Sequence, residues 1–223
     1  MTRSIVWRLI LKDWYLCRVV VASVAVIGVA SVAALYVRDG FTSLVAMITS
    51  LIAVIFLGSL LPSLTIVNER KRQNLAFVMS LPVSPMQYTT AKIVANLVAF
   101  LALWLPIAIG MIGTVVSARV FGGIIPLMVV AALAPFTAFA LFMAVAIVSE
   151  SETWAITTMA ASNVAYTFVW LFISRIPDMF RDLSSPVAIW RPQMVSIVTV
   201  EAVAIVLAFG LTFYLQSKKT NFI

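Results

Sequence analysis

The side chains that most often perform chemistry are scarce in this sequence. Its 223 residues include eight acidic residues, one cysteine and no histidine. Acid–base catalysis by histidine and metal sites built from cysteine and histidine are therefore excluded, and Cys17 has no partner in the chain for a disulfide. The phosphate-binding pattern Gly-x-x-x-x-Gly-Lys-Ser/Thr is also absent from the sequence. We therefore expect no catalytic residue, no cofactor and no metal ion on this chain.

Two polar residues stand within long apolar stretches and are candidates for contact with a transported molecule. Glu201 lies between Val200 and Ala202, and an ionisable group at membrane depth is costly enough to suggest a function. Its carboxylate could contact a cationic or polar substrate, or it could reach the lipid headgroups or pair with an arginine outside the membrane. Asn163 could line the same path, although hydrogen bonding between helices is the simpler explanation for it.

The segment from Asn68 to Lys92 carries the most informative pattern. It has charged residues first and apolar residues at helical spacing after them. This arrangement is typical of a small docking surface, in which charges steer the partner protein during association and apolar residues anchor it once bound. The charged residues are Glu69, Arg70, Lys71 and Arg72, and the apolar residues are Leu75, Val78 and Met79. Leu81 and Pro82 begin a turn that ends this short helix. Ser84 is expected to cap the helix that follows, with Pro85 at its first position.

Membrane-spanning helices must position these residues, because the composition is far outside the range of soluble domains. The chain is 63% hydrophobic and 10% charged, whereas soluble domains are about 45–50% apolar and about 25% charged. A stretch of about 20 apolar residues is long enough to cross a bilayer. Six such spans are expected, at about residues 19–37, 41–67, 93–118, 124–148, 153–173 and 195–215. We predict one all-α transmembrane domain over residues 1–223.

Two further segments lie beside these spans. Residues 3–18 combine four cations with an apolar face, which favours an amphipathic helix at the membrane surface over a plain basic flank. Residues 174–193 are rich in apolar side chains and contain three prolines. This pattern favours one or two short interfacial or re-entrant helices on the external side, with an ordinary external loop as the alternative.

The net charge of +7 follows topology and does not indicate a nucleic-acid partner. If the N-terminus lies inside and the chain crosses the membrane at each span, ten of the 15 Lys and Arg residues fall on the inner side and five on the outer side. Cytoplasmic loops carry such an excess of cations. We therefore expect both termini, and the docking segment of residues 68–92, to lie in the cytoplasm.

The docking segment resembles that of a known family, the membrane subunits of ABC exporters of the type-2 permease class, especially its short six-span bacterial members. Family members have an acidic-basic cluster after the second span, a short helix, a Leu-Pro-Val/Ile-Ser turn, and a lysine ten residues after that proline. This chain has Glu69–Arg72, then Leu81–Ser84, then Lys92. It departs from the pattern at Pro85, where the family usually has a basic residue, so a role of that cation cannot be transferred.

The resemblance implies a type-2 ABC exporter permease in a bacterial cytoplasmic membrane. Residues 68–92 would then contain the coupling helix, which docks into a groove on a separate ATPase subunit that binds ATP and Mg²⁺, and the assembly would contain two copies of that ATPase. A second permease copy, expected to be identical, would complete the translocation path. The alternatives are an ion-driven secondary transporter, an intramembrane lipid-processing enzyme, and, for the segment itself, an ordinary solvated charge run.

Overall fold

The computed structural model describes residues 2–37, 39–71, 84–118, 122–149 and 151–219. Within these ranges the chain is helical and contains no strand. The elements are α1 (Thr2–Ala34), α2 (Gly40–Pro62), the π-helix η1 (Ser63–Val67), α3 (Asn68–Lys71), α5 (Pro85–Ala118), the 3₁₀-helix η2 (Gly122–Ile124), α6 (Ile125–Val148), α7 (Glu152–Ser174), α8 (Met179–Leu183) and α9 (Pro192–Ser217). Six helices are long and apolar enough to cross a membrane. The prediction of an all-α chain with six spans is confirmed, which indicates a multi-pass membrane protein.

Short polar side chains mark where several of these helices begin. Asp39 accepts a hydrogen bond from the backbone N–H of Thr42 at the start of α2, which lowers the pKa of Asp39. Ser84 and Gln87 cap α5 reciprocally, because the Gln87 N–H donates to the Ser84 hydroxyl and the Ser84 N–H donates to the Gln87 side chain. The predicted cap at Ser84, with Pro85 at the first helical position, is confirmed.

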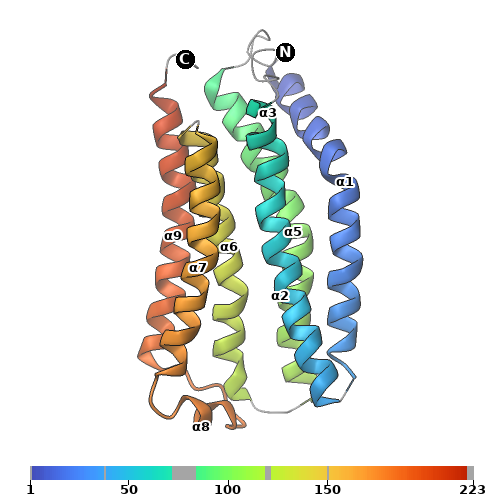
Figure 1. The fold of residues 1–223 in the computed structure, drawn as a ribbon, viewed down its shortest axis with the longest axis vertical. Helices are drawn as coiled ribbons and strands as arrows, with labels where there is room; N and C mark the ends of the chain where they lie inside the picture. Colours follow the sequence, from blue (N-terminus) through green and yellow to red (C-terminus); the bar gives the residue numbers. More distant parts are fainter. Residues whose placement is uncertain (1, 38, 72–83, 119–121, 150, 220–223) are drawn as a thin grey trace.

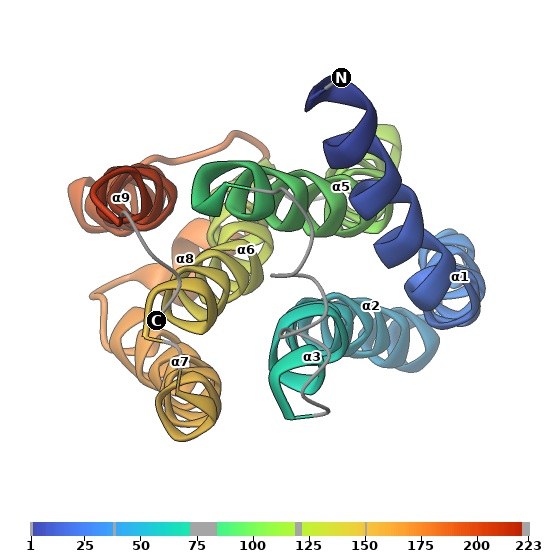
Figure 2. The same ribbon diagram turned by 90° about the horizontal axis from the view of Figure 1, so that it is seen from above.

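The six long helices form two groups of three helices. In the first group α1 packs against α2 and α5, and in the second α6 packs against α7 and α9. Contacts of α6 with α2 and α5 join the groups (Figures 1 and 2). Both chain termini lie at one end of the bundle, called here the terminal end, and α8 lies at the other, called the α8 end (Figure 1).

The predicted surface helix of residues 3–18 and the first span are continuous in α1. This helix has 33 residues, a length of about 50 Å, whereas the hydrocarbon layer is about 30 Å thick. Its first turns run obliquely across the terminal end, above α5 (Figure 2). Leu9 is buried there against Tyr88 and Ala91 of α5, while Trp7 and Tyr15 are exposed. The 3–18 segment is therefore packed on α5 through one side and open on the other.

The core between the two groups is built from aromatic rings beside small residues. The rings of Phe100 and Phe139 stack with centroids 4.3 Å apart and an interplanar angle of 2°. Gly58 of α2 lies against both side chains, and a Cβ atom there would be 3.1 Å from the Phe100 ring and 3.4 Å from the Cβ atom of Phe139. Close approach of α2 to α5 and α6 thus depends on a residue without a side chain.

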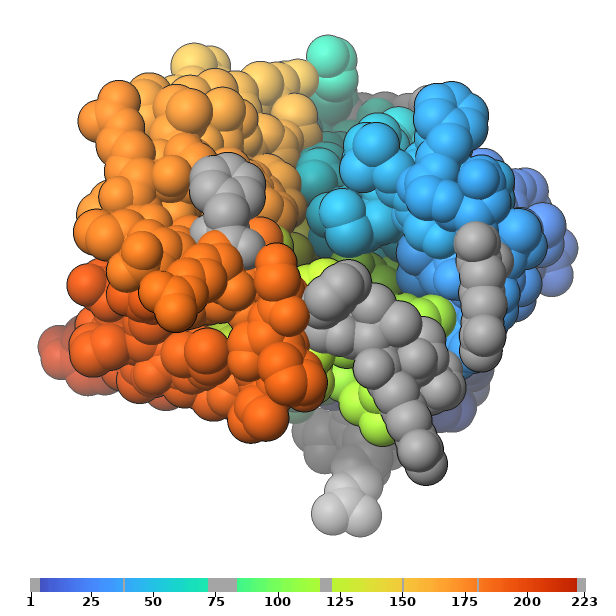
Figure 3. All heavy atoms as spheres, turned by 90° about the horizontal axis from the view of Figure 1, so that it is seen from below, coloured from blue at the N-terminus to red at the C-terminus, as the bar shows by residue number. Residues whose placement is uncertain are grey.

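The segment of residues 174–193 contains one short helix, α8, and packs on the rest of the chain. Its Ile176 and Met179 are buried against Ile173 and Met194. Gly123 lies so close that a Cβ atom would be 1.8 Å from the carbonyl oxygen of Asp182. Seen from the α8 end, this segment gathers over the α6, α7 and α9 group, beside the atoms of α1 and α2 (Figure 3). Part of its apolar content is thus used for packing within the chain.

An ion pair fixes the two ends of this segment to each other. Arg191 donates a hydrogen bond to the Asp182 carboxylate and lies 3.8 Å from a carboxylate oxygen of Asp178. The hydrogen bond from Arg191 lowers the pKa of Asp182, and the same bond raises the pKa of Arg191. Asp178 has a positive φ of 57°, which reverses the chain before α8.

Candidate functional site: a buried ionic cluster at the terminal end

Lys92 of α5 is the centre of a cluster of charged side chains inside the bundle. Its side chain is 1% exposed. The ammonium nitrogen lies 2.9 and 3.0 Å from the two carboxylate oxygens of Asp13, and 2.7 Å from Oε2 of Glu69. It also donates a hydrogen bond of 2.7 Å to the backbone carbonyl of Thr65. One ammonium group thus joins α1, η1 and α3 to α5.

The two carboxylates of the cluster are almost as enclosed as the lysine. The side chains of Asp13 and Glu69 are 1% and 7% exposed. Lys12, which is half-exposed, pairs with both of them, and its nitrogen is 3.5 Å from Asp13. The hydroxyl of Tyr88 donates a hydrogen bond of 3.3 Å to Glu69. Two lysines and two acids make the cluster neutral, which is the condition under which buried charges are tolerated.

The local backbone around η1 explains how Lys92 reaches a carbonyl group. Pro62 has no N–H and disturbs the regular helix, and the chain continues as the π-helix Ser63–Val67. A π-turn changes the register of the helical hydrogen bonds and so redirects its carbonyl groups. The Thr65 hydroxyl donates to Leu61 O at 2.8 Å and lies 3.0 Å from the Asn96 side-chain oxygen. The Asn96 amide in turn donates to Lys92 O at 2.8 Å.

The residues predicted to dock a partner divide between the described chain and the region outside it. Glu69 is inside the ionic cluster, so its carboxylate is engaged within the chain. Arg70 donates a hydrogen bond of 3.1 Å to the carbonyl of Ile147, and Lys71 forms an exposed ion pair of 3.2 Å with Glu152. The remaining predicted docking residues, Arg72, Leu75, Val78, Met79, Leu81 and Pro82, lie outside the described residues. Their docking role stays a prediction.

The C-terminal end of α6 is contacted by α3 on one side and by α9 on the other. The carbonyl of Ile147 accepts hydrogen bonds from Arg70 and from the Gln216 side chain of α9, each at 3.1 Å. Lys219 donates to the neighbouring carbonyl of Val148 at 3.4 Å. Because Lys71 also pairs with Glu152 at the start of α7, the end of α3 is tied to the second helix group as well as to α1 and α5.

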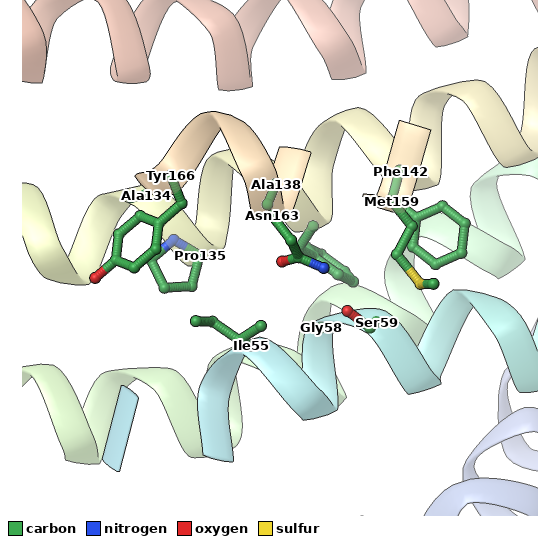
Figure 4. Close-up of a pocket in the computed structure, with 11 residues that line it drawn as sticks. Ile55, Gly58, Ser59, Ala134, Pro135, Ala138, Phe142, Met159, Asn163 and Tyr166 are labelled. Carbon is green, nitrogen blue, oxygen red and sulfur yellow. The ribbon is translucent and has the colours of Figure 1, made fainter. Parts of the chain in front are cut away.

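A narrow crevice lies between α2, α6 and α7, further along the bundle. Asn163 and Tyr166 of α7 line it together with Ser59 of α2 and Pro135 of α6 (Figure 4). The side chain of Asn163 points from α7 toward Ser59 across the crevice (Figure 4). The sequence prediction placed Asn163 on a substrate path, and the structure places it on the wall of this crevice.

Glu201 is not among the residues that line the crevice. It lies on the buried face of α9 together with Met194 and Ala208, and the main neighbour of α9 is α6. The structure therefore does not bring Glu201 and Asn163 into one site. Glu201 Oε2 is buried and has no hydrogen-bond partner within the described part of the chain.

The sequence-based reasoning did not identify the ionic cluster. Asp13 and Lys92 are 79 residues apart, and Lys12 and Glu69 are 57 residues apart, so no local spacing connects them. In the sequence, Lys92 belongs to the motif of the docking segment, and Asp13 lies within the amphipathic stretch of residues 3–18. The one available signal is that Asp13 is the single acid among the four cations of residues 3–18.

The cluster has the composition of a structural site. Ion pairs already satisfy its carboxylates, and the described residues contain no group of three or more Cys, Asp or Glu side chains that could hold a metal ion. Comparisons of the chain with family models, with curated proteins and with solved structures find no match.

Proposed function

We propose that this chain is the membrane-spanning permease subunit of an ATP-driven exporter of the type-2 ABC class. The observation that carries the proposal is the ionic cluster at the base of the docking segment, in which Lys92 joins Asp13 and Glu69. Glu69 lies two residues before the end of α3, and Lys92 lies seven residues after the start of α5. Both ends of the segment between them are thus anchored in the bundle.

The cluster suggests how motion at the docking segment would reach the membrane. Separating the two partners of a buried ion pair leaves each charge uncompensated inside the protein, which is strongly unfavourable. A displacement of α3 or of the first turns of α5 would therefore carry α1 along, because Asp13 stays bound to Lys92. The contact of Arg70 with Ile147 would transmit the same displacement to α6. Such coupling is what a subunit needs if its source of energy is on another chain.

The proposed partners follow from this assignment. The segment would dock on an ATPase subunit through Leu75, Val78 and Met79, with two ATPase copies supplying ATP and Mg²⁺ chemistry. A second copy of the permease would complete the path, and the crevice beside Asn163 would be part of its wall. The terminal end would face the cytoplasm across a bacterial cytoplasmic membrane, and no nucleic acid is involved.

The docking assignment is tested by co-purification with an ATPase encoded in the neighbouring reading frame. The double variant Leu75→Asp with Met79→Asp is expected to lose the ATPase during purification, because two carboxylates would occupy the apolar anchor positions. The matched control is Val187→Asp with Ile189→Asp, which changes two exposed apolar residues at the α8 end. Loss of the ATPase in both variants, or in neither, contradicts the assignment.

Ion-driven secondary transport is the second candidate, and the buried Glu201 favours it, since such transporters use ionisable groups within the membrane. The two candidates are distinguished by measuring transport of the substrate across the membrane of vesicles that contain the chain and the ATPase. The ATP-driven proposal requires that transport stops without ATP and continues when an uncoupler removes the proton gradient. The opposite pattern would show secondary transport.

A further inference from the structure

The bundle contains two kinds of buried carboxylate. Asp13 and Glu69 each lie within 3.0 Å of the Lys92 ammonium group, and their charges are compensated. Glu201 is about as enclosed as Glu69, with 7% of its surface exposed. Its Oε2 atom accepts no hydrogen bond, and no ion pair found among the described residues includes it.

The position of Glu201 along α9 is deep in the bundle. It follows the first residue of the helix, Pro192, by nine positions, which corresponds to about 14 Å along the helix axis. This distance is about half the thickness of a hydrocarbon layer of about 30 Å. Snorkelling to the headgroups is the usual escape for a charged group near a helix end, but the buried Oε2 atom shows that this carboxyl group turns into the protein.

The helices packed around Glu201 offer no cation. The main neighbour, α6, has no ionisable residue over Ile125–Val148. The ionisable residues of α5 are Tyr88 and Lys92, and both belong to the ionic cluster near the terminal end. The described arginines at the α8 end are engaged or exposed, since Arg191 pairs with Asp182 and Arg175 is exposed.

Tyr166 of α7 is the titratable group that interacts with Glu201. Its hydroxyl oxygen is buried and lacks a hydrogen-bond partner within the described ranges. A phenol carries no charge that would offset a carboxylate. The same side chain lines the crevice between α2, α6 and α7.

We propose that Glu201 is a proton-binding site: its carboxyl group holds a proton in the resting bundle and is neutral there. A proton is the one cation that can compensate this group without a cavity and without a partner side chain. It also turns the carboxyl group into a hydrogen-bond donor as well as an acceptor. The site is independent of the ionic cluster and of the proposed ATPase docking.

Reaction with a hydrophobic carbodiimide tests the proposal on the full chain in liposomes. Dicyclohexylcarbodiimide adds to protonated carboxyl groups, and the stable N-acylurea product keeps all atoms of the reagent, so peptide mass spectrometry finds the labelled residue. We expect labelling at Glu201 at neutral pH, with less labelling as the pH is raised. Glu69 is the internal control of similar burial and should stay unlabelled, because its carboxylate is paired with Lys92 and Lys12. Absence of labelling at Glu201, or equal labelling at Glu69, would overturn the proposal.

Thermal unfolding provides a second test that does not depend on access of a reagent. A group that binds a proton in the folded chain and releases it in the unfolded chain stabilises the fold at low pH, and this stabilisation is lost as the pH rises. Glu201→Gln imitates the neutral carboxyl group and cannot lose a proton. Between about pH 6 and about pH 9 the wild-type Tm should fall by about 2–4 °C more than the Tm of Glu201→Gln. Parallel curves would refute a protonated Glu201.

Discussion

At the scale of the residue, Lys92 is a charged side chain whose burial costs free energy and whose ion pairs hold three segments of the chain together. A lysine that is 1% exposed would be strongly unfavourable alone, because its charge is removed from water. Two carboxylates and a backbone carbonyl satisfy its three N–H donors, so the cost is offset within the cluster. The arrangement also makes each member dependent on the others.

Substitution of Lys92 by methionine should therefore destabilise the chain strongly. Lys92→Met leaves Lys12 as the only cation paired with Asp13 and Glu69 among the described residues, and removing one partner of a buried ion pair costs about 3–5 kcal/mol. Thermal unfolding in detergent measures the loss. Lys71→Met is the matched control, because the exposed pair of Lys71 with Glu152 is worth at most about 1 kcal/mol. A further Asp13→Leu change should recover part of the loss in Lys92→Met. Equal stability of the two single variants would contradict the role of the cluster.

The sequence could predict the individual charged residues of this site but not their pairing. The motif that ends at Lys92 is visible in the sequence, and the apolar surroundings of Glu201 are visible too. Which acid meets which lysine depends on how α1 crosses α5, and that crossing is set by packing of side chains far apart in the chain. The engagement of Glu69 within the bundle could not be read from residues 68–72, since charge runs of this kind usually remain in water.

At the scale of the element, apolar length and capping residues determine most helices. The second predicted span, about residues 41–67, corresponds to α2 followed by η1, and the predicted cap at Ser84 begins α5. The π-helix was not predicted, because only Pro62 marks it in the sequence and a proline also fits an ordinary kink. The helix of residues 3–18 was predicted separately from the first span, since nothing in the sequence shows that the two are continuous.

The close contact between η2 and the segment of residues 174–193 predicts an effect on stability at this scale. Gly123→Ala would place a methyl group 1.8 Å from the backbone oxygen of Asp182, so the backbone of one element must move. We expect a loss of stability of about 1–3 kcal/mol, measured by thermal unfolding. Gly210→Ala is the control, because no atom outside its own helix lies within 4 Å and alanine favours the helix. Unchanged stability of Gly123→Ala would show that this segment is packed loosely.

At the scale of the whole molecule, two helix groups meet along α6, with α2 and α5 on one side of it and α7 and α9 on the other. The class of the protein follows from composition alone, because 63% hydrophobic residues exceed what a soluble domain of this size needs. The grouping of the helices does not follow from composition, since five of the six spans have a mean hydropathy between 2.3 and 2.6 and only Glu152–Ser174 differs, at 1.4. It is set by small residues such as Gly58 and by polar contacts such as that of Arg70 with Ile147.

An even number of spans places the two chain ends on one side of the membrane. Reporter domains fused to Met1 and to Ile223 should therefore be active on the same side, and the excess of cations favours the cytoplasm. A fluorescent protein that matures only in the cytoplasm and an enzyme that is active only outside it are the two reporters. Fusions that report opposite sides would show that one of the six helices does not cross.

The ionic cluster also has a consequence for biosynthesis. A nascent chain presents Asp13 to the membrane long before the ribosome reaches Lys92, 79 residues later. Until then Lys12 is the only cation of the cluster that has been made, and the carboxylate of Glu69 joins it 23 residues before Lys92. The first helix therefore reaches its final environment only after the third span has been synthesised. Insertion of this chain should involve its first three spans as one cooperative unit, with α5 as the helix that completes it.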